Sequence, residues 1–439
     1  MDSRDSKPDK KLQATLGYKF VVRNSYFTDV FEKGEARVIY NLFALFAISA
    51  FVRKGYTEYV TEGRVRFGFD FLTFMFVDFD KTLLVWSSCL GASCACFFCF
   101  RIWASFRNFN ESFKKFWDLG WTTLLLFYYF YSFKLTGEAI RFYKLPLVAR
   151  MFCALESVRV VMKSHSFVRN TLPGVIHSGD WLHLPSFSSY ARFLFLPTLI
   201  YHENYPLRKE INWKFFFKTL VELVVALFII NFRLEKGWRF IHEIGLRKFT
   251  VTEIVYDALE NSIEDVFSVI FVHYILLHCI QNLFGELLRF GDRLFYTNWW
   301  DLVDLTTSLV KWNFLVAVWI YYYVYVDFKN YVCDNVFLTR LVSFVLSFVV
   351  HEWCAYHLGN TICTLVFIFF IFIVFPTFYF ELPDRNIVVI LNACLFTLFL
   401  NVVRLYAAEY YISINVPIDN RSRLEQMFLP RFINYIGWE

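Results

Sequence analysis

The chain has 439 residues, of which 57% are hydrophobic and 22% aromatic, and its formal net charge is +5. A soluble domain of this size cannot bury so much apolar surface, so the composition predicts a polytopic membrane protein. Because hydrocarbon offers no water to free backbone groups, its spans must be helical, which makes the fold all-α. The modest charge predicts neither a nucleic-acid partner nor a polybasic tail.

The first 35 residues are predicted to form a cytosolic N-terminal arm. Met1 to Asn24 is charged and lacks the basic, apolar and small-residue regions of a signal peptide. Lys and Arg favour the cytosolic side of a membrane. The arm carries Arg4, Lys7, Lys10, Lys11, Lys19, Arg23 and Lys33. Residues 36–439 then form a single transmembrane domain.

A membrane span needs about 20 apolar residues to cross a hydrocarbon core of about 30 Å. Ten stretches are candidates: Val38–Val52, Thr82–Phe100, Leu119–Phe133, Leu145–Val168, Phe215–Phe232, Val266–Gly285, Trp312–Val326, Leu341–His357, Leu358–Phe380 and Asn386–Val403. Of these, Trp312–Val326 is rich in Tyr and is predicted to be a partly buried helix instead of a span. Leu145–Val168 carries Glu156 and Arg159 on one helical face, so it is expected to face protein or water.

Two further patterns carry less information. Cys89, Cys94, Cys96 and Cys99 lie in a charge-free span with no His nearby, so they are expected to serve helix contacts and not a metal. Asn110 and Asn420 begin glycosylation sequons, whose use depends on an orientation that the sequence does not fix.

The most unusual stretch runs from Leu288 to His351. It contains Phe295-Tyr296-Thr297-Asn298-Trp299-Trp300-Asp301, then Trp312-Asn313, and later His351 inside an apolar run. An ionisable group at membrane depth is costly and is therefore a candidate for function, although a hydrogen-bonded structural histidine is the alternative. His351-Glu352 lacks the second histidine of HExxH, since the next one is His357, so a zinc site is not expected.

These segments resemble the sterol and diacylglycerol acyltransferase branch of the membrane-bound O-acyltransferases (the MBOAT superfamily). That branch has an FYxDWWN motif and a histidine in an apolar helix. The sterol members are most similar, because Met162–Asn170 resembles their MKxHSFVREN stretch and Phe193–Tyr201 their FLFxPTLIY stretch. Leu277–Arg293 likewise resembles their LHCWxNxFxEMLRFxDR stretch.

The resemblance implies an MBOAT fold with about nine transmembrane helices that enclose a catalytic chamber. It also implies an O-acyltransferase of the endoplasmic reticulum membrane that takes acyl-CoA as co-substrate and needs no cofactor or metal. The expected acceptor is a membrane lipid hydroxyl, with a sterol favoured, and the expected assembly is a homodimer or homotetramer.

The resemblance assigns catalysis to His351 and Asn313. His351 would take the proton of the attacking hydroxyl, which suits an imidazole that burial keeps neutral. Asn313 would bind the thioester carbonyl or orient the acceptor. The alternative role for Asn313 is that of a helix N-cap.

The resemblance also implies a CoA-binding region and two acceptor-site candidates. The CoA candidates are Phe295, Tyr296, Trp299, Trp300, Lys311, Tyr325 and Ser347, with Arg289 and Arg293 near the phosphates. The acceptor-site candidates are His278 and Glu286, which lie eight residues apart on one helical face. The alternatives are an interfacial aromatic belt for the tryptophan motif and a packing role for the other residues.

Two departures from the family pattern keep other functions open. Ala317 replaces the second histidine of the family's WNxxxHxW segment, and Asn298 and Asp301 are exchanged relative to its FYxDWWN motif. A diacylglycerol or fatty-alcohol acyltransferase and an inactive lipid-binding relative are therefore alternatives. A multispan transporter is the rival from another class, but no inverted repeat is present.

Overall fold

The computed structural model describes residues 18–32, 37–67, 73, 77–108, 111–178, 184–244, 247–300, 305–362, 375, 385–415 and 422–437. The first half of the chain forms α2 (Tyr26–Glu32), α3 (Arg37–Glu62), α5 (Phe79–Phe106), α6 (Lys114–Phe142), α7 (Leu147–Ser178) and α8 (Phe187–Phe195). Next come α9 (Trp213–Ile244), β1 (Phe249–Thr250), α10 (Val251–Glu260), α11 (Ser262–His273), the π-helix η2 (Tyr274–Ile280) and α12 (Gln281–Leu287).

The second half continues with short helices before two long ones. It contains α13 (Leu305–Trp312), α14 (Phe314–Ile320), the π-helix η3 (Tyr321–Tyr325), α15 (Val326–Tyr331), α16 (Val336–Gly359) and α18 (Arg385–Asn415). It ends with α19 (Arg423–Phe428), the 3-10 helix η6 (Arg431–Tyr435) and β2 (Ile436–Gly437). The two short strands pair in parallel, Phe249 with Ile436 and Thr250 with Gly437.

The structure is mostly helical, in agreement with the all-α membrane fold predicted from the sequence. Within the described residues, four helices are long and apolar enough to cross a membrane: Phe79–Phe106, Trp213–Phe232, Glu264–Leu287 and Val336–Gly359. Each contains one of the predicted spans. Most of the predicted span Leu358–Phe380 falls outside the described residues, and the total of nine spans stays a prediction.

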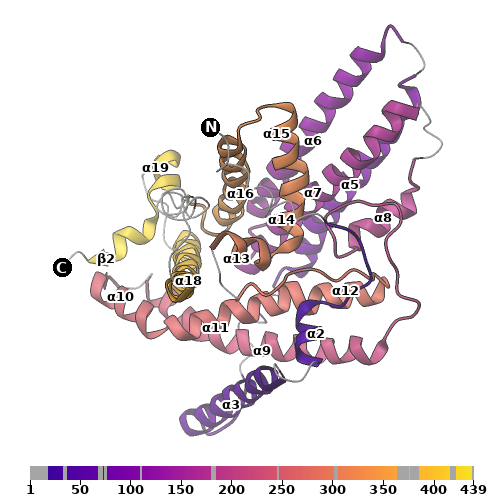
Figure 1. The fold of residues 1–439 in the computed structure, drawn as a ribbon. Coiled ribbons are helices and arrows are strands. Elements are labelled where there is room, and N and C mark those ends of the chain that lie inside the picture. The colour runs from indigo at the N-terminus through magenta and orange to yellow at the C-terminus, as the bar shows by residue number, and fades with distance from the viewer. Residues whose placement is uncertain are drawn as a thin grey trace, which may run out of the picture.

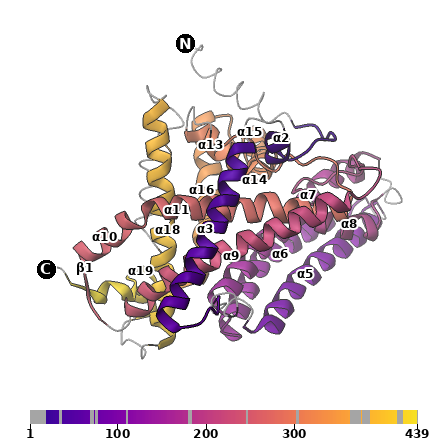
Figure 2. The same ribbon diagram turned by 90° about the horizontal axis from the view of Figure 1, so that it is seen from below.

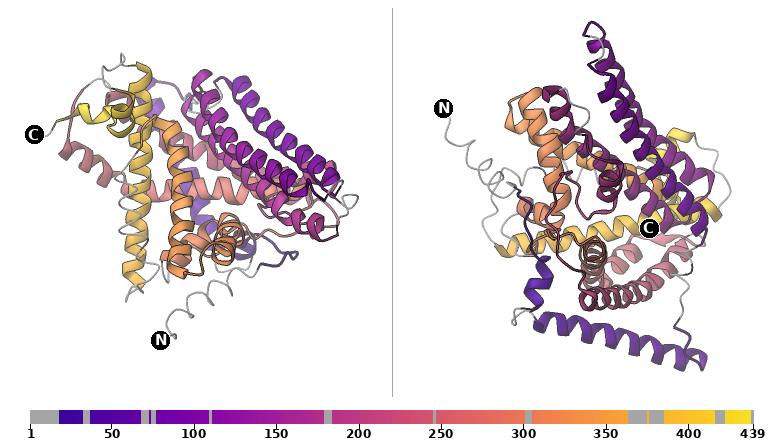
Figure 3. Two further views of the ribbon diagram at one scale, coloured as in Figure 1. Left: turned by 90° about the horizontal axis from the view of Figure 1, so that it is seen from above. Right: turned by 90° about the vertical axis from the view of Figure 1, so that its right-hand side faces the viewer.

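The long helices form three groups, shown in Figure 1 and, from above and from the side, in Figure 3. Helices α5, α6 and α7 pack side by side, α9 lies along the continuous run of α11, η2 and α12, and α16 packs against α18. Helix α3 packs against α9 and lies at the bottom edge in Figure 1; in Figure 2, seen from below, it crosses in front of α9. Helix α16 also contacts α7 and η3, so the helix that carries His351 joins the groups.

Two charged groups of α7 explain how this polar helix packs. The Arg159 guanidinium bonds both Glu156 oxygens, at 2.7 and 2.8 Å, and donates to the Leu194 carbonyl at 2.6 Å. The fully buried Lys163 ammonium donates to the carbonyls of Phe193, Leu194 and Leu196 at the end of α8. The prediction that Glu156 and Arg159 face protein is therefore confirmed, and both cations satisfy carbonyls that α8 leaves open.

The predicted helix Trp312–Val326 is interrupted at its first turn. Asn313 leaves the helical conformation, with φ −133° and ψ 82°, so α13 ends at Trp312 and α14 begins at Phe314. Within the described residues this stretch is absent from the candidate spans, in agreement with its predicted role as a partly buried helix.

The N-terminal arm is anchored on the segment that follows α12. The buried Asp292 carboxylate accepts hydrogen bonds from the Tyr18 hydroxyl (2.9 Å) and the Val21 amide (3.1 Å). It also accepts from Nε (2.7 Å) and Nη2 (3.1 Å) of the Arg23 guanidinium. The Arg23 amide also donates to the Gly291 carbonyl at 3.0 Å. Burial, and secondly the Asp292 charge, raises the pKa of the Tyr18 hydroxyl, so it stays protonated as a donor. The arm and the segment that precedes the tryptophan motif therefore lie side by side.

Replacing Asp292 should release the arm. Asp292→Asn keeps the shape of the side chain but removes the charge that strengthens these hydrogen bonds, each worth about 1.5–3 kcal/mol. Trypsin should then cleave after Lys19 or Arg23 roughly tenfold faster or more, because cleavage follows the population of the open state.

The matched control is Glu111→Gln, which removes an exposed pair with Lys114 that is expected to contribute little. Equal cleavage rates in wild type and Asp292→Asn would show that this carboxylate does not hold the arm.

Candidate functional site

The tryptophan motif is mostly buried. Phe295 and Tyr296 are 0% exposed and Trp299 is 6% exposed, whereas Trp300 is 38% exposed. Trp300 stacks on Phe27 of the arm, with ring centroids 5.0 Å apart and planes 4° from parallel. The first three side chains therefore form the packed interior of the loop, and Trp300 is the one with accessible surface.

The loop is hydrogen-bonded to the segment around Asn313, so the structure brings together two motifs that the sequence separates. The Phe314 amide donates to the Phe295 carbonyl at 3.1 Å, and the Thr297 amide to the Lys311 carbonyl at 3.0 Å. The rings of Trp299 and Trp312 meet edge to face at 4.7 Å. An irregular backbone can be buried in this way only because its polar groups find partners.

His278 is part of this packed region. Its Nδ1 lies 2.6 Å from the Tyr296 hydroxyl and 3.3 Å from Asn282 Nδ2. Asn282 Nδ2 can only donate, so Nδ1 is an acceptor, and the Tyr296 hydroxyl, whose pKa burial raises well above its usual value, donates to it. The His278 Nδ1 is thus an acceptor with two donors, which indicates that this side chain positions Tyr296.

Glu286 forms a buried ion pair with Arg293. Both side chains are 1% exposed or less, and Glu286 Oε1 also accepts from the Asn212 amide at 2.6 Å. The expectation that Arg293 lies near CoA phosphates is therefore wrong, because its guanidinium is enclosed and neutralised. Arg289 is exposed and donates to the Lys209 carbonyl. A contact of Glu286 with an acceptor lipid stays a prediction.

Asn313 caps α14. Its Oδ1 accepts from the Val316 amide at 3.3 Å, which is the N-cap role considered from the sequence. This bond occupies the oxygen end of the amide. Within the described residues the Nδ2 end has no hydrogen-bond partner. Capping therefore orients a potential donor, and the two roles considered for Asn313 are compatible.

His351 lies on the surface of α16, eight residues before the helix ends. Its Nδ1 is 2.7 Å from the Ser347 carbonyl oxygen one turn earlier. A carbonyl only accepts, so Nδ1 carries the proton and Nε2 presents its lone pair. The expectation that the protein buries this imidazole is wrong. The sequence predicts the position of His351 along the helix, but the packing of neighbouring helices against α16 decides which of its faces is buried.

The remaining candidates divide between buried and accessible positions. Tyr325 is 6% exposed and stacks on Tyr321 at 5.7 Å within η3, the element that α16 packs against. Lys311 and Ser347 are half-buried. No hydrogen bond joins the described side chains of His351 and Asn313; α16 contacts η3, which follows α14 along the chain.

No group of three or more His, Cys, Asp or Glu side chains suited to a metal ion occurs among the residues that the structure describes. The absence of a cofactor stays a prediction.

No family model matches the chain. Comparison with curated proteins finds 28% identity to mouse sterol O-acyltransferase 1 over 445 residues, which cover 98% of this chain and 79% of the relative. Mouse sterol O-acyltransferase 2 is 29% identical over 416 residues, covering 92% and 78%. Human sterol O-acyltransferase 2 is 30% identical over 346 residues, covering 76% and 64%.

The chain is an acyltransferase related to the sterol O-acyltransferases. The similarity extends well beyond the motifs, since it covers nearly all of the chain. An enzyme is the class predicted from the sequence, so that prediction is confirmed and the transporter alternative is not supported.

Several residues that support the tryptophan motif and its surroundings were not predicted from the sequence. Asp292 lies in a stretch compared with the family, but its partners Tyr18 and Arg23 are more than 260 positions away. Ser25 bonds Asn282 Nδ2 at 2.9 Å and thereby joins the arm to the surroundings of His278. Contacts of such long range leave no periodic pattern in a single sequence.

Proposed function

We propose that the chain transfers the acyl group of acyl-CoA to the hydroxyl of a membrane lipid, preferably a sterol, giving a steryl ester and free CoA. The similarity to sterol O-acyltransferases over 98% of the chain is the observation that supports this function most strongly. We also propose a homodimer or homotetramer in the endoplasmic reticulum membrane.

In the proposed reaction His351 is the general base. The hydroxyl oxygen attacks the thioester carbonyl while its proton passes to Nε2, the nitrogen left available by the Nδ1–Ser347 hydrogen bond. The tetrahedral intermediate then collapses, the carbon–sulfur bond breaks, and the imidazolium returns the proton to the leaving thiolate. Proton and electron pairs balance, so no oxidant or metal is needed.

Asn313 is the proposed donor to the oxyanion. Its Nδ2 would bind the carbonyl oxygen as negative charge develops, because Oδ1 is already held by the Val316 amide. Donors fixed in advance are effective because they need no reorganisation during the reaction. The buried part of the tryptophan motif would support this segment through the Phe314–Phe295 and Thr297–Lys311 backbone bonds.

The CoA moiety is proposed to bind at the accessible edge of this region. Trp300 and Lys311 are the candidates with exposed surface, since Phe295, Tyr296 and Trp299 are packed inside the loop. An indole face can stack on an adenine, and an ammonium group can pair with a phosphate. Ser347 and Tyr325 would act from α16 and η3.

Replacing the base should abolish most turnover. His351→Ala is expected to lower ester formation from acyl-CoA by about 10²–10⁴-fold, the usual contribution of a general base. Because the imidazole is exposed, folding and expression should be retained. The measurement is labelled ester formed by membranes that contain matched amounts of each variant.

The control for this test must be a substitution at an exposed position of α16. His357, the next histidine of α16, is buried against Gly137 and is therefore unsuitable as a neutral control. Leu346→Ala removes an exposed side chain from the same helix and should leave turnover unchanged. Wild-type turnover in His351→Ala would refute the assignment of the base.

A second substitution separates the two roles of Asn313. Asn313→Ser keeps an oxygen that caps α14 but removes the amide donor, so stability should change by less than about 1 kcal/mol. Turnover is expected to fall roughly 10²-fold or more if Nδ2 stabilises the oxyanion. Thermal unfolding and ester formation are measured on the same preparations. Full turnover in Asn313→Ser would leave Asn313 with the capping role alone.

A further inference from the structure

A cluster of basic side chains lies where α6, α7 and α16 meet, away from the tryptophan motif. Arg150 is 5% exposed, donates from Nε to the Leu145 carbonyl at 2.7 Å, and lies over the Tyr410 ring at 4.6 Å. Its charge and that of Arg141 act on each other and on His357. Among the residues that the structure describes, neither arginine forms an ion pair with a carboxylate. The cluster thus holds two arginines without a paired carboxylate among the described residues, Arg150 buried and Arg141 exposed.

His357 is held rigidly within this cluster. It is 3% exposed, and a Cβ added to Gly137 of α6 would lie 2.5 Å from its Cε1 and 2.7 Å from its Nε2. The imidazole therefore occupies the space that the absence of a side chain at Gly137 leaves. Its Nδ1 is buried without a hydrogen-bond partner in the described part of the chain. It is one of nine such atoms among the described residues, and it is the one that lies beside Arg141 and Arg150.

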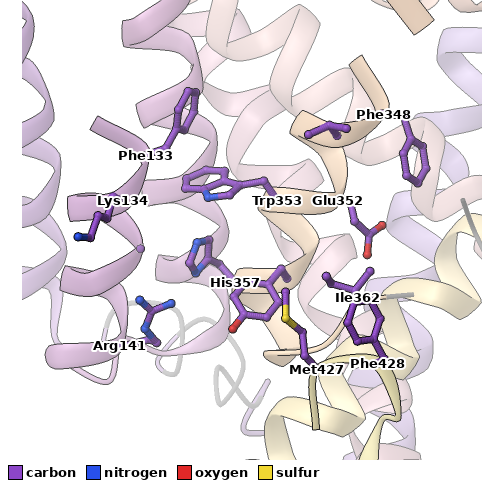
Figure 4. A pocket seen from close by; sticks show the side chains of 13 residues that line it. Phe133, Lys134, Arg141, Phe348, Glu352, Trp353, His357, Ile362, Met427 and Phe428 are labelled. Carbon is purple, nitrogen blue, oxygen red and sulfur yellow. The ribbon is translucent and has the colours of Figure 1, made fainter. Parts of the chain in front are cut away.

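The cluster borders a cavity of about 560 Å³ between α6, α16 and α19. Figure 4 shows Arg141 and His357 near one wall, and Phe348, Ile362 and Phe428 across the cavity from them. The volume lies within the range of about 300–1,000 Å³ that is usual for small-molecule sites. Glu352 is the single acidic residue among the described lining residues, and its Oε1 accepts from the Tyr406 hydroxyl at 2.8 Å.

We propose that this cavity binds the carboxylate of a long-chain fatty acid. The carboxylate would pair with the exposed Arg141 guanidinium, and the enclosed His357 ring would form part of the wall beside it. The aliphatic chain would lie on the aromatic and aliphatic residues of the opposite wall. A neutral alcohol has the same apolar part, but it would leave the Arg141 guanidinium without an anionic partner.

This site is distinct from the one proposed for acyl transfer. His357 follows His351 by six residues, which turns it by about 240° around the helix axis at 3.6 residues per turn. The lining of the cavity includes His357 and Glu352 but not His351. Binding of a fatty acid therefore needs neither acyl-CoA nor the acceptor, and it can be tested even if the proposed reaction is refuted.

The test is equilibrium binding of radiolabelled palmitate to the purified full-length chain in detergent, without acyl-CoA. Wild type should bind palmitate saturably. Arg141→Gln removes an exposed guanidinium and should weaken binding about tenfold or more, since a charge-assisted hydrogen bond is lost. Gly137→Ala, which forces the His357 ring to move, should also weaken it. The matched control is Lys115→Gln, which removes an exposed cation of α6 outside the cavity and should have no effect.

Two competitors define the ligand class. Hexadecanol should displace palmitate poorly, and its own weak binding should not respond to Arg141→Gln. Phosphatidylglycerol, with two chains and a phosphate, should also compete poorly. Palmitate binding that is unchanged in Arg141→Gln would overturn the proposal. Equal competition by hexadecanol would overturn the carboxylate specificity, and better competition by phosphatidylglycerol would overturn the assignment to a single-chain ligand.

Discussion

The site depends on a constraint on irregular backbone: from Leu288 to Trp300 the chain is not helical, yet most of it is buried. Each buried amide and carbonyl in such a segment must find a partner, or it costs the free energy of an unmade hydrogen bond. The partners come from three directions. The Arg23 amide of the arm donates to the Gly291 carbonyl, and the connection before α9 supplies the Pro206 carbonyl and the Arg208 amide. The start of α14 supplies the Phe314 amide. Gly291 allows one of these approaches, since a Cβ there would lie 2.8 Å from the Pro206 carbonyl oxygen.

The same constraint links the two motifs recognised in the sequence. Because Phe295 and Phe314 share a backbone hydrogen bond, the tryptophan loop cannot shift without moving the residue that follows Asn313. The N-cap on α14 then determines which end of the Asn313 amide is available. The loop aromatics can therefore matter for catalysis without touching a substrate, by holding this segment in place.

Much of the fold could be predicted from the positions of apolar runs along the chain. The span over Thr82–Phe100 lies inside α5, the span over Phe215–Phe232 lies inside α9, and the one over Leu341–His357 lies inside α16. Apolar runs of this length with two charged residues or fewer have few alternatives in a membrane. The Glu156–Arg159 pair was also predictable, since residues three apart on a helix are neighbours.

The sequence did not predict which side of each helix faces the protein, nor which distant residues pair. It placed His351 at membrane depth but also expected burial, and the structure leaves the imidazole exposed on α16. It placed Arg293 near CoA, but the Arg293 guanidinium is neutralised by Glu286, which lies seven residues earlier near the end of α12. It gave no sign that the His357 ring is enclosed, because that enclosure comes from the approach of Gly137 on α6. These are tertiary contacts, and a single sequence carries no local signal for them.

The most direct measurement is to express the chain in membranes that lack sterol and glyceride acyltransferases, supply labelled acyl-CoA, and separate the neutral lipids. With sterol and diacylglycerol both present, most label is predicted to appear in steryl ester. Label mainly in triacylglycerol would contradict a sterol acceptor. The absence of label from every neutral lipid, with the protein present in the membrane at normal levels, would contradict the proposed acyl transfer to a lipid hydroxyl.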